Sequence, residues 1–139
     1  MALLEKTLCI KRSKIPRAGE GLFTKQFIPK GTLIVEYKGR AKKWKEVLEG
    51  KVFNGYVYYI NRNHVIDAMT FKKALARFAN DAKGLTKVKG LSNNSIYVVQ
   101  KYKVFIRAAK NIYPGEEILV PYGKEYWEVI AENILCNKS

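Results

Sequence analysis

A tyrosine stands at an unusual place in the C-terminal stretch NIYPGEEILVPYGKEYW (111–127). Tyr122 ends a short apolar run and is followed at once by Gly123, with two more aromatic residues close behind. Two interpretations are open for this residue. Tyr122 is a core side chain before a turn, or its phenol points into a site, where a neutral hydroxyl can orient a reacting group.

A second candidate for chemistry is the glycine pair in RAGEGLFT, Gly19 and Gly21. A dinucleotide-binding loop needs a third glycine, a preceding strand and a following helix. In this chain a strand-like run follows the glycines instead. The spacing alone therefore favours a loop that needs a positive φ over a loop that approaches a ligand.

The elements that must position these residues are short. A β-branched apolar run at 32–37 is typical of a buried strand, and Trp44, Val47 and Leu48 share one face of an amphipathic helix at 41–50. The other expected elements are a weak strand at 21–28, hairpins of 56–60 with 64–68 and of 96–100 with 102–108, a helix at 70–78, a loop at 79–95, a last strand at 116–122 and a terminal helix at 124–134. Strands dominate without βαβ alternation, so we expect a β-rich α+β fold.

The charge of the chain is large and uneven. Its 139 residues are expected to form a single domain, with a formal net charge of +14. Residues 1–110 hold 24 Lys or Arg against 7 Asp or Glu, whereas residues 111–139 hold 2 against 5. This charge favours either a solvated basic surface or contact with a polyanion such as nucleic acid or anionic lipid. A basic substrate would be drawn to the acidic segment, at Glu116, Glu117, Glu125 and Glu128.

The two cysteines, Cys9 and Cys136, have no metal-ligand spacing, so we interpret both as free thiols of a reducing compartment. No apolar run approaches the roughly 20 residues of a membrane span. The charged N-terminal stretch also lacks the apolar core of a secretory signal. We therefore expect an intracellular protein without membrane contact, either cytoplasmic or nuclear if it acts on the chromatin of a host.

Four stretches occur in a specific order: AGEGLFTKQFIPKGTLIVEYKG, YYINRNHVIDA with LARFAND, NNSIYV, and VFIRAAKNIYPGEEILVPYG. Together they resemble the opening, middle and closing segments of the SET-domain protein lysine methyltransferases. The resemblance covers about residues 8–127 of the chain. The short C-terminal end, 124–139, is similar to that of minimal viral and bacterial SET proteins, which close the site with a helix.

The resemblance implies the SET fold, in which small β-sheets surround a knot-like substructure formed by threading the closing segment against the Arg-Phe-x-Asn loop. It also implies transfer of a methyl group from S-adenosylmethionine to a lysine ε-amine. The implied catalytic residues are Tyr122, which orients the amine, and Tyr37 and Tyr97, which line the lysine channel. A tyrosine hydroxyl near the amine limits the number of methyl groups in this family. Tyr97 can supply that hydroxyl, whereas Val120, at the second such position, cannot.

The resemblance also assigns the residues that hold the cofactor. They are the backbone of Gly19, Glu20, Gly21, Leu22 and Phe23, the loop residues Arg77, Phe78 and Asn80, and an aromatic ring on the adenine, Trp127. Each assignment competes with a structural alternative. Asn80 can form an Asx turn, and Trp127 can pack the terminal helix.

The chain departs from the family pattern in two places. Asp81 stands where the family usually has a histidine with a mostly structural, hydrogen-bonding role. Cysteine-rich flanking segments are absent and Cys136 alone cannot build a zinc site, so we expect no metal. We expect Asp67, in the hairpin, to be a turn or core hydrogen-bonding residue.

Three functions stay open from the sequence. The first is a lysine methyltransferase, as a monomer or a homodimer, that acts on a basic protein such as a histone tail. A catalytically degenerate SET-like binding module would explain Asp81. A basic nucleic-acid-binding β domain would explain the charge, and contact with nucleic acid is also compatible with the enzyme.

Overall fold

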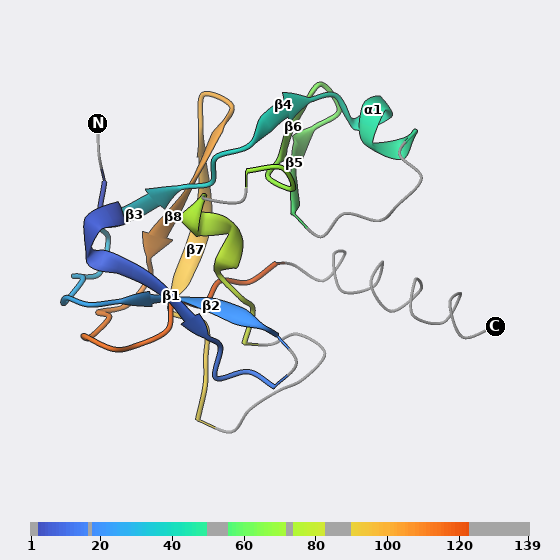
Figure 1. Ribbon diagram of the computed structural model, residues 1–139. Helices are drawn as coiled ribbons and strands as arrows, with labels where there is room; N and C mark the ends of the chain where they lie inside the picture. The colour runs from blue at the N-terminus through green and yellow to red at the C-terminus, as the bar shows by residue number, and fades with distance from the viewer. Residues whose placement is uncertain (1–2, 17, 50–55, 72–73, 83–89, 123–139) are drawn as a thin grey trace.

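The chain is built from short strands with few helices (Figure 1). The computed structural model describes residues 3–16, 18–49, 56–71, 74–82 and 90–122. Within these ranges the strands form one two-stranded and two three-stranded sheets, with antiparallel pairing throughout. The expected β-rich class is confirmed, whereas the expected terminal helix at 124–134 lies outside the described residues.

The N-terminal sheet pairs β1 (Leu8–Arg12) with β2 (Glu20–Thr24). A short 3-10 helix, η1 (Glu5–Thr7), precedes β1. The sequence pattern did not predict β1, and β2 is shorter than the strand expected at 21–28. Thr24 ends β2 because its hydroxyl donates to the Gln26 carbonyl at 2.6 Å and accepts the Gln26 N–H at 3.2 Å, which turns the chain.

The central sheet has the order β3–β8–β7 and contains β3 (Leu33–Glu36), β7 (Ser95–Gln100) and β8 (Lys103–Ala108). The predicted β7–β8 hairpin is confirmed. Every second residue of β8 is buried, from Val104 to Ala108, as expected for a strand with one face on the core. The two turn residues between β7 and β8 both have a positive φ, 48° and 65°.

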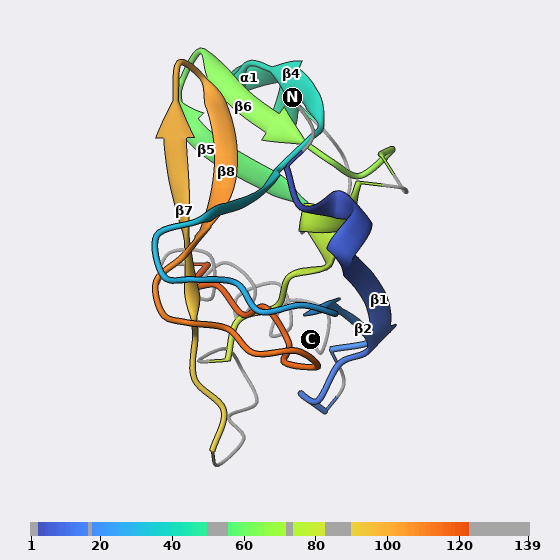
Figure 2. The same ribbon diagram turned by 90° about the vertical axis from the view of Figure 1, so that its left-hand side faces the viewer.

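The third sheet has the order β4–β6–β5 and contains β4 (Arg40–Lys42), β5 (Val57–Asn61) and β6 (His64–Asp67). The hairpin predicted at 56–60 and 64–68 is therefore confirmed. The predicted helix at 41–50 is shorter, as α1 (Trp44–Leu48), because the residues before it pair with β6. In Figures 1 and 2 this sheet and the β1–β2 sheet lie toward opposite ends of the central sheet.

The α-helix expected at 70–78 is wrong. The described part of this stretch contains only a 3-10 helix, η2 (Leu75–Phe78). Side chains three residues apart lie in line in a 3-10 helix. Leu75 and Phe78 therefore still pack together against the core, as the apolar pattern predicted.

The strand expected at 116–122 is also wrong as a member of a sheet. The segment instead makes isolated bridges, from Phe23 to Glu117 and, in parallel, from Asn80 to Leu119. The Asn94 side chain accepts the Leu119 N–H at 3.0 Å and donates to the Glu117 carbonyl at 2.9 Å. Since the partners come from three distant parts of the chain, the closing segment is threaded between them, as the resemblance implied.

Candidate active site

Three tyrosine rings meet where the central sheet and the β4–β6–β5 sheet join. Tyr37 follows β3, Tyr58 lies on β5 and Tyr97 lies on β7. The ring centroids are 6.0 Å apart for Tyr37 and Tyr97, 6.3 Å for Tyr37 and Tyr58, and 5.0 Å for Tyr58 and Tyr97. We call these three residues the tyrosine junction, and it unites two of the three tyrosines that the sequence singled out.

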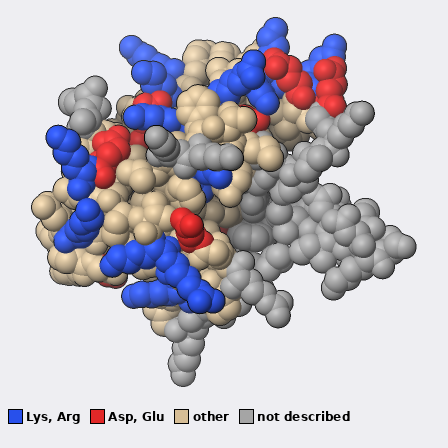
Figure 3. Space-filling model, viewed as in Figure 1, with Lys and Arg blue, Asp and Glu red and all other residues tan. Residues whose placement is uncertain are grey.

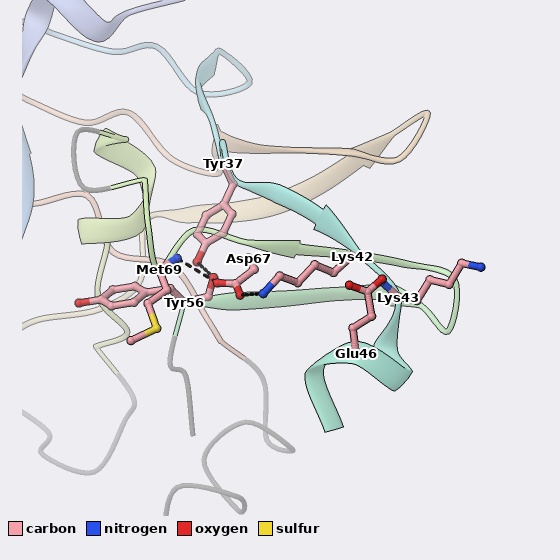
Figure 4. Close-up of polar contacts among 7 residues, drawn as sticks. All are labelled: Tyr37, Lys42, Lys43, Glu46, Tyr56, Asp67 and Met69. Carbon is pink, nitrogen blue, oxygen red and sulfur yellow. Dashed lines mark hydrogen bonds and ion pairs between the residues drawn. The ribbon is translucent and has the colours of Figure 1, made fainter. Parts of the chain in front are cut away.

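Tyr37 forms the buried wall of the tyrosine junction. Its side chain is 6% exposed, and its hydroxyl donates to the Tyr56 carbonyl at 2.7 Å. This hydrogen bond joins the end of β3 to the start of the β5–β6 hairpin (Figure 4). The contact fixes the orientation of the Tyr37 ring toward Tyr58 and Tyr97.

Tyr58 is a site residue that sequence reasoning missed. Its neighbour Tyr59 faces outward and packs edge-on against Trp44, with ring centroids 5.1 Å apart. Alternation along the strand therefore turns Tyr58 inward. Burial raises the pKa of Tyr58 above its ordinary value of 10.0, because the phenolate loses its hydration. Tyr58 thus presents a neutral hydroxyl at neutral pH.

Tyr122 is held at the end of the threaded segment by two polar contacts. Its backbone N–H donates to Asp81 Oδ2 at 2.8 Å, and its hydroxyl donates to the Ala79 carbonyl. Its ring packs against the core cluster to which the tyrosine junction also belongs. The phenol of Tyr122 therefore points back toward the Arg-Phe-x-Asn loop rather than into solvent.

The glycine loop lies against the same segment. Gly19 is exposed and has a φ of +72°, so the positive-φ interpretation holds for this residue. Gly21 is a glycine for a different reason: a Cβ atom there would overlap the carboxylate of Glu117 and lie 3.2 Å from Ser13 Cβ. The Asn80 side-chain amide donates to the Glu20 carbonyl at 3.0 Å. The predicted cofactor loop and the Asn80 loop are thus in direct contact.

The comparison with protein families decides the identity of this arrangement. Residues 19–123 match the family model described as SET domain. The chain belongs to the SET domain family. Among solved structures, this SET domain resembles the methyltransferase domain of human PR domain-containing protein 2, with a TM-score of 0.58 and 26% identity. The match covers 83% of this chain and 76% of that chain.

Two curated relatives have similar sequences. One is the histone-lysine N-methyltransferase, H3 lysine-4 specific, of Cryptococcus neoformans var. neoformans serotype D (strain B-3501A), which is 30% identical over 132 residues, 88% of this chain and 8% of that protein. The other is the histone-lysine N-methyltransferase set-17 of Caenorhabditis elegans, 29% identical over 133 residues, 93% of this chain and 45% of that protein. The chain therefore spans less than half the length of either relative.

Asp81 has a defined structural role in this SET domain. Its carboxylate is 5% exposed, accepts the Tyr122 N–H through Oδ2 and accepts the Asn93 side-chain amide through Oδ1 at 2.9 Å. Asn93 in turn accepts the Ala82 N–H at 2.8 Å. Asp81 thus performs the hydrogen-bonding role that the resemblance gave to the family's histidine, and it holds Tyr122 in place.

Glu117 was assigned wrongly from the sequence. It was expected to attract a basic substrate, but its side chain is 3% exposed. The carboxylate accepts the Ser13 hydroxyl at 2.6 Å and the Lys14 N–H at 3.0 Å. Asn80 also donates to it at 3.4 Å. Glu117 therefore joins the 13–14 turn, the glycine loop and the Asn80 loop. Its neighbour Glu116 is exposed and accepts the Tyr113 N–H at 2.7 Å.

The remaining predicted cofactor residues fall into two groups. Leu22 and Phe23 have buried side chains, and the Leu22 carbonyl accepts the Ile118 N–H at 2.7 Å, so their assignment to the cofactor stays a prediction. Arg77 donates to the carbonyls of Ala68 and Met69 at 2.9 and 2.8 Å. The assignment of Phe78 to the cofactor stays a prediction, and Trp127, Glu125, Glu128 and Cys136 lie outside the described residues.

Arg77 supports the tyrosine junction indirectly, through its contact with Tyr56. Its guanidinium carbon lies 4.0 Å from the centroid of the Tyr56 ring and 5.3 Å from that of Phe78. Such cation–π contacts stabilise a partly buried cation. Arg77 therefore fixes Tyr56, whose carbonyl in turn accepts the hydroxyl of Tyr37. This indirect role does not depend on a bound cofactor.

Asp67 is a core hydrogen-bonding residue, as expected. Figure 4 shows its carboxylate between Lys42 of β4 and the backbone of Met69. Oδ2 pairs with Lys42 Nζ at 2.8 Å, and Oδ1 accepts the Met69 N–H at 2.9 Å. The residue is 7% exposed, and the pair links β4 to the end of β6. Asp67 therefore supports the site without being part of it.

The described residues contain neither a metal-binding cluster nor a membrane-spanning helix. Among them, no group of three or more His, Cys, Asp or Glu side chains is placed to hold a metal ion. In the same part of the chain, no helix has the length and apolar character needed to cross a membrane. The expected absence of a metal stays a prediction.

Proposed function

We propose that this SET domain is an S-adenosylmethionine-dependent protein-lysine N-methyltransferase. The observation that carries the proposal is the tyrosine junction, in which three strands bring three neutral aromatic rings together. Aromatic walls enclose the alkyl stem of a lysine and tolerate its positive charge. Family membership and the names of the two curated relatives support the same activity.

The side chains of the junction suit a reaction that needs a neutral amine. A free lysine has a pKa of about 10.4, and an apolar channel lowers it because the ammonium loses hydration. Tyr37 and Tyr58 add no negative charge that would restore the ammonium. The chain then has mainly to align the amine, which is catalysis by proximity and orientation. In this arrangement Tyr122 orients the amine, and Tyr37, Tyr58 and Tyr97 exclude water.

The residues present fit the cofactor. The exposed glycine loop at Gly19 and Glu20 contacts Asn80, and Asp81 in the next position holds Tyr122. Backbone carbonyls and a side-chain amide suit the amino-acid end of S-adenosylmethionine, and aromatic rings suit its cation. When bound, the cofactor supplies a methyl group on a positively charged sulfur. Gly19, Glu20 and Asn80 would hold it.

We propose a lysine of a basic protein, such as a histone tail, as the acceptor. The names of the relatives favour a histone. The burial of Glu117 removes one of the four glutamates on which the attraction of a basic substrate rested. Of the remaining three, only Glu116 lies among the described residues, and it is exposed. The proposed preference for lysine therefore rests more on the rings of the tyrosine junction than on long-range charge.

A degenerate binding module is the second candidate, because Asp81 departs from the family pattern. Its hydrogen bonds to Tyr122 and Asn93 weigh against this candidate, since they keep the closing tyrosine anchored. The experiment that separates the two uses S-adenosylmethionine with a labelled methyl group and a mixture of core histones. The enzyme yields labelled methyl-lysine, detected by mass spectrometry.

Calorimetry with S-adenosylmethionine provides the second measurement. Binding without methyl transfer to histones or to a lysine-rich peptide would support the degenerate module. Absence of both binding and transfer would overturn the proposal.

A further inference from the structure

Two aromatic side chains lie together on the surface, outside the tyrosine junction. Phe27 is 47% exposed and Tyr113 is 55% exposed, and their ring centroids are 5.3 Å apart with planes at 47°. We call this pair the aromatic platform. Its two residues belong to the loops that follow β2 and β8, neither of which contributes a ring to the tyrosine junction.

The aromatic platform is held rigidly. The neighbouring residues Ile28 and Ile112 form an isolated antiparallel bridge, with reciprocal backbone hydrogen bonds of 2.8 and 2.9 Å. Both isoleucines are buried, at 1% and 0% exposure. Because adjacent side chains of an extended segment point in opposite directions, burial of the isoleucines turns Phe27 and Tyr113 outward. The packing of Ile28 and Ile112 in the core therefore determines the exposure of the two rings.

The surroundings of the platform are basic. Lys25, Lys30 and Lys110 are exposed in the same two loops. In the described part of the chain the ion pairs are Lys38 with Glu5 and Lys42 with Asp67, so none of these three lysines pairs with a described carboxylate. The nearest carboxylate in sequence, that of Glu116, accepts the N–H of Tyr113. Figure 3 shows Lys and Arg side chains around the edge where these loops lie in Figure 1.

We propose that the aromatic platform binds single-stranded nucleic acid, with a base stacked on the exposed rings and Lys25 and Lys30 along the phosphate backbone. Stacking on aromatic side chains within a positive groove is the general mode for single strands, and it tolerates any base. The net charge of +14 adds long-range attraction for a polyanion. The proposal goes beyond the methyltransferase activity and does not depend on it.

The path of the strand follows from a neighbouring pocket. This pocket is lined by both basic and acidic groups, among them Lys14, Lys110, Glu116 and Glu117. Two carboxylates disfavour a phosphate there. We therefore place the backbone along Lys25 and Lys30, which do not line this pocket, whereas Lys110 does.

The test measures binding of a fluorescent oligothymidylate of about 12 nucleotides, a length within the range that one such surface covers. The double variant F27L/Y113L keeps the apolar area but removes the aromatic faces. We expect about tenfold weaker binding or more, the size of loss expected when one stacked base loses its aromatic partner. F71L is the matched control, because Phe71 is also exposed (42%) and lies outside the platform. It should bind as the unchanged protein does.

The lysines are tested by salt dependence. K25Q/K30Q should lower the slope of log K against log salt by about 0.7 for each phosphate that the protein no longer neutralises. K43Q/K45Q, which removes two exposed lysines near α1, is the matched control and should change the slope less. Equal effects of the two variants would mean diffuse attraction and would overturn the proposal.

Two further outcomes also contradict the proposal. Unchanged oligonucleotide binding by F27L/Y113L is the first. The second is that vesicles with anionic lipid bind F27L/Y113L as tightly as they bind the unchanged protein. Such a partner needs apolar area and charge but no aromatic face. The oligonucleotide affinity of F27A/Y113A, with its folding checked by circular dichroism, separates loss of the platform from loss of the fold.

Discussion

The imidazole ring of His64 is stacked on the ring of Tyr102, with centroids 3.7 Å apart and planes within 6° of parallel. His64 is the first residue of β6, and Tyr102 lies in the turn between β7 and β8. The stack therefore joins the two hairpins that carry Tyr58 and Tyr97. Tyr102 has a φ of 65°, which costs free energy for a residue other than glycine. The contact with His64 offsets part of this cost.

The stack predicts an energetic coupling between the two hairpins. His64→Ala and Tyr102→Leu should be coupled by about 0.5–1.5 kcal/mol in the free energy of unfolding. Leucine keeps the strained backbone position occupied by a non-glycine residue, so the cycle isolates the ring contact. Urea denaturation of the two single variants and the double variant measures the coupling. Additive effects would show that the stack contributes nothing to stability.

Tyr122→Phe should lower turnover about a hundredfold or more, as expected when a positioned polar catalytic group is removed. The affinity for S-adenosylmethionine should change little. Steady-state kinetics with a lysine-rich peptide, together with calorimetry, measures both quantities. The control is Tyr113→Phe, and turnover of Tyr122→Phe equal to this control would refute the assignment.

Asp81→Ala should destabilise the fold by about 1–3 kcal/mol, because it leaves the partly buried N–H of Tyr122 and the amide of Asn93 without this acceptor. Asp81→Asn should cost less, since the amide oxygen can still accept one of the two hydrogen bonds. The free energy of unfolding of both variants is measured in urea. A smaller loss for alanine than for asparagine would contradict this role.

Tyr97 predicts a limit on the product. Val120 is fully buried and has no hydroxyl, whereas Tyr97 lies in the tyrosine junction. We expect the unchanged protein to stop at mono- or dimethyl-lysine and Tyr97→Phe to add one more methyl group. Mass spectrometry of a peptide driven to completion by each form decides this. Efficient trimethylation by both forms would remove Tyr97 from the channel.

Tyr58 predicts a change of stability at alkaline pH. Burial raises the pKa of Tyr58 in the folded state above the unfolded value of 10.0. The contribution of the protonated Tyr58 to the free energy of unfolding is therefore fully present below pH 10.0. The contribution is lost as the pH rises through the folded pKa. Thermal denaturation should show a steeper alkaline loss for the unchanged protein than for Tyr58→Phe. Tyrosinate absorption that titrates identically in both proteins would contradict a shifted Tyr58.

Hairpins were the most predictable part of the fold. Short runs rich in β-branched and aromatic residues, on either side of a turn, located β5–β6 and β7–β8, since such runs are typical of paired strands. The 70–78 helix failed because a single 3-10 turn, η2, satisfies the same i and i+3 pattern over four residues. β1 was not predicted because its sequence, LCIKR, has a weak apolar pattern. Its residues become more exposed toward Arg12.

The chemical types of the site residues were determined by the sequence itself: Tyr37, Tyr97 and Tyr122 stand in motifs that identify their positions. Tyr58 was hidden, because alternation in VYY defines two faces but not which face meets another sheet. Glu117 was misjudged for a related reason. Its partner Ser13 lies 104 residues away, and local composition cannot report such a contact. Which polar groups are buried, and which rings meet, was decided only by the tertiary structure, because burial depends on the surface that folding brings opposite each side chain.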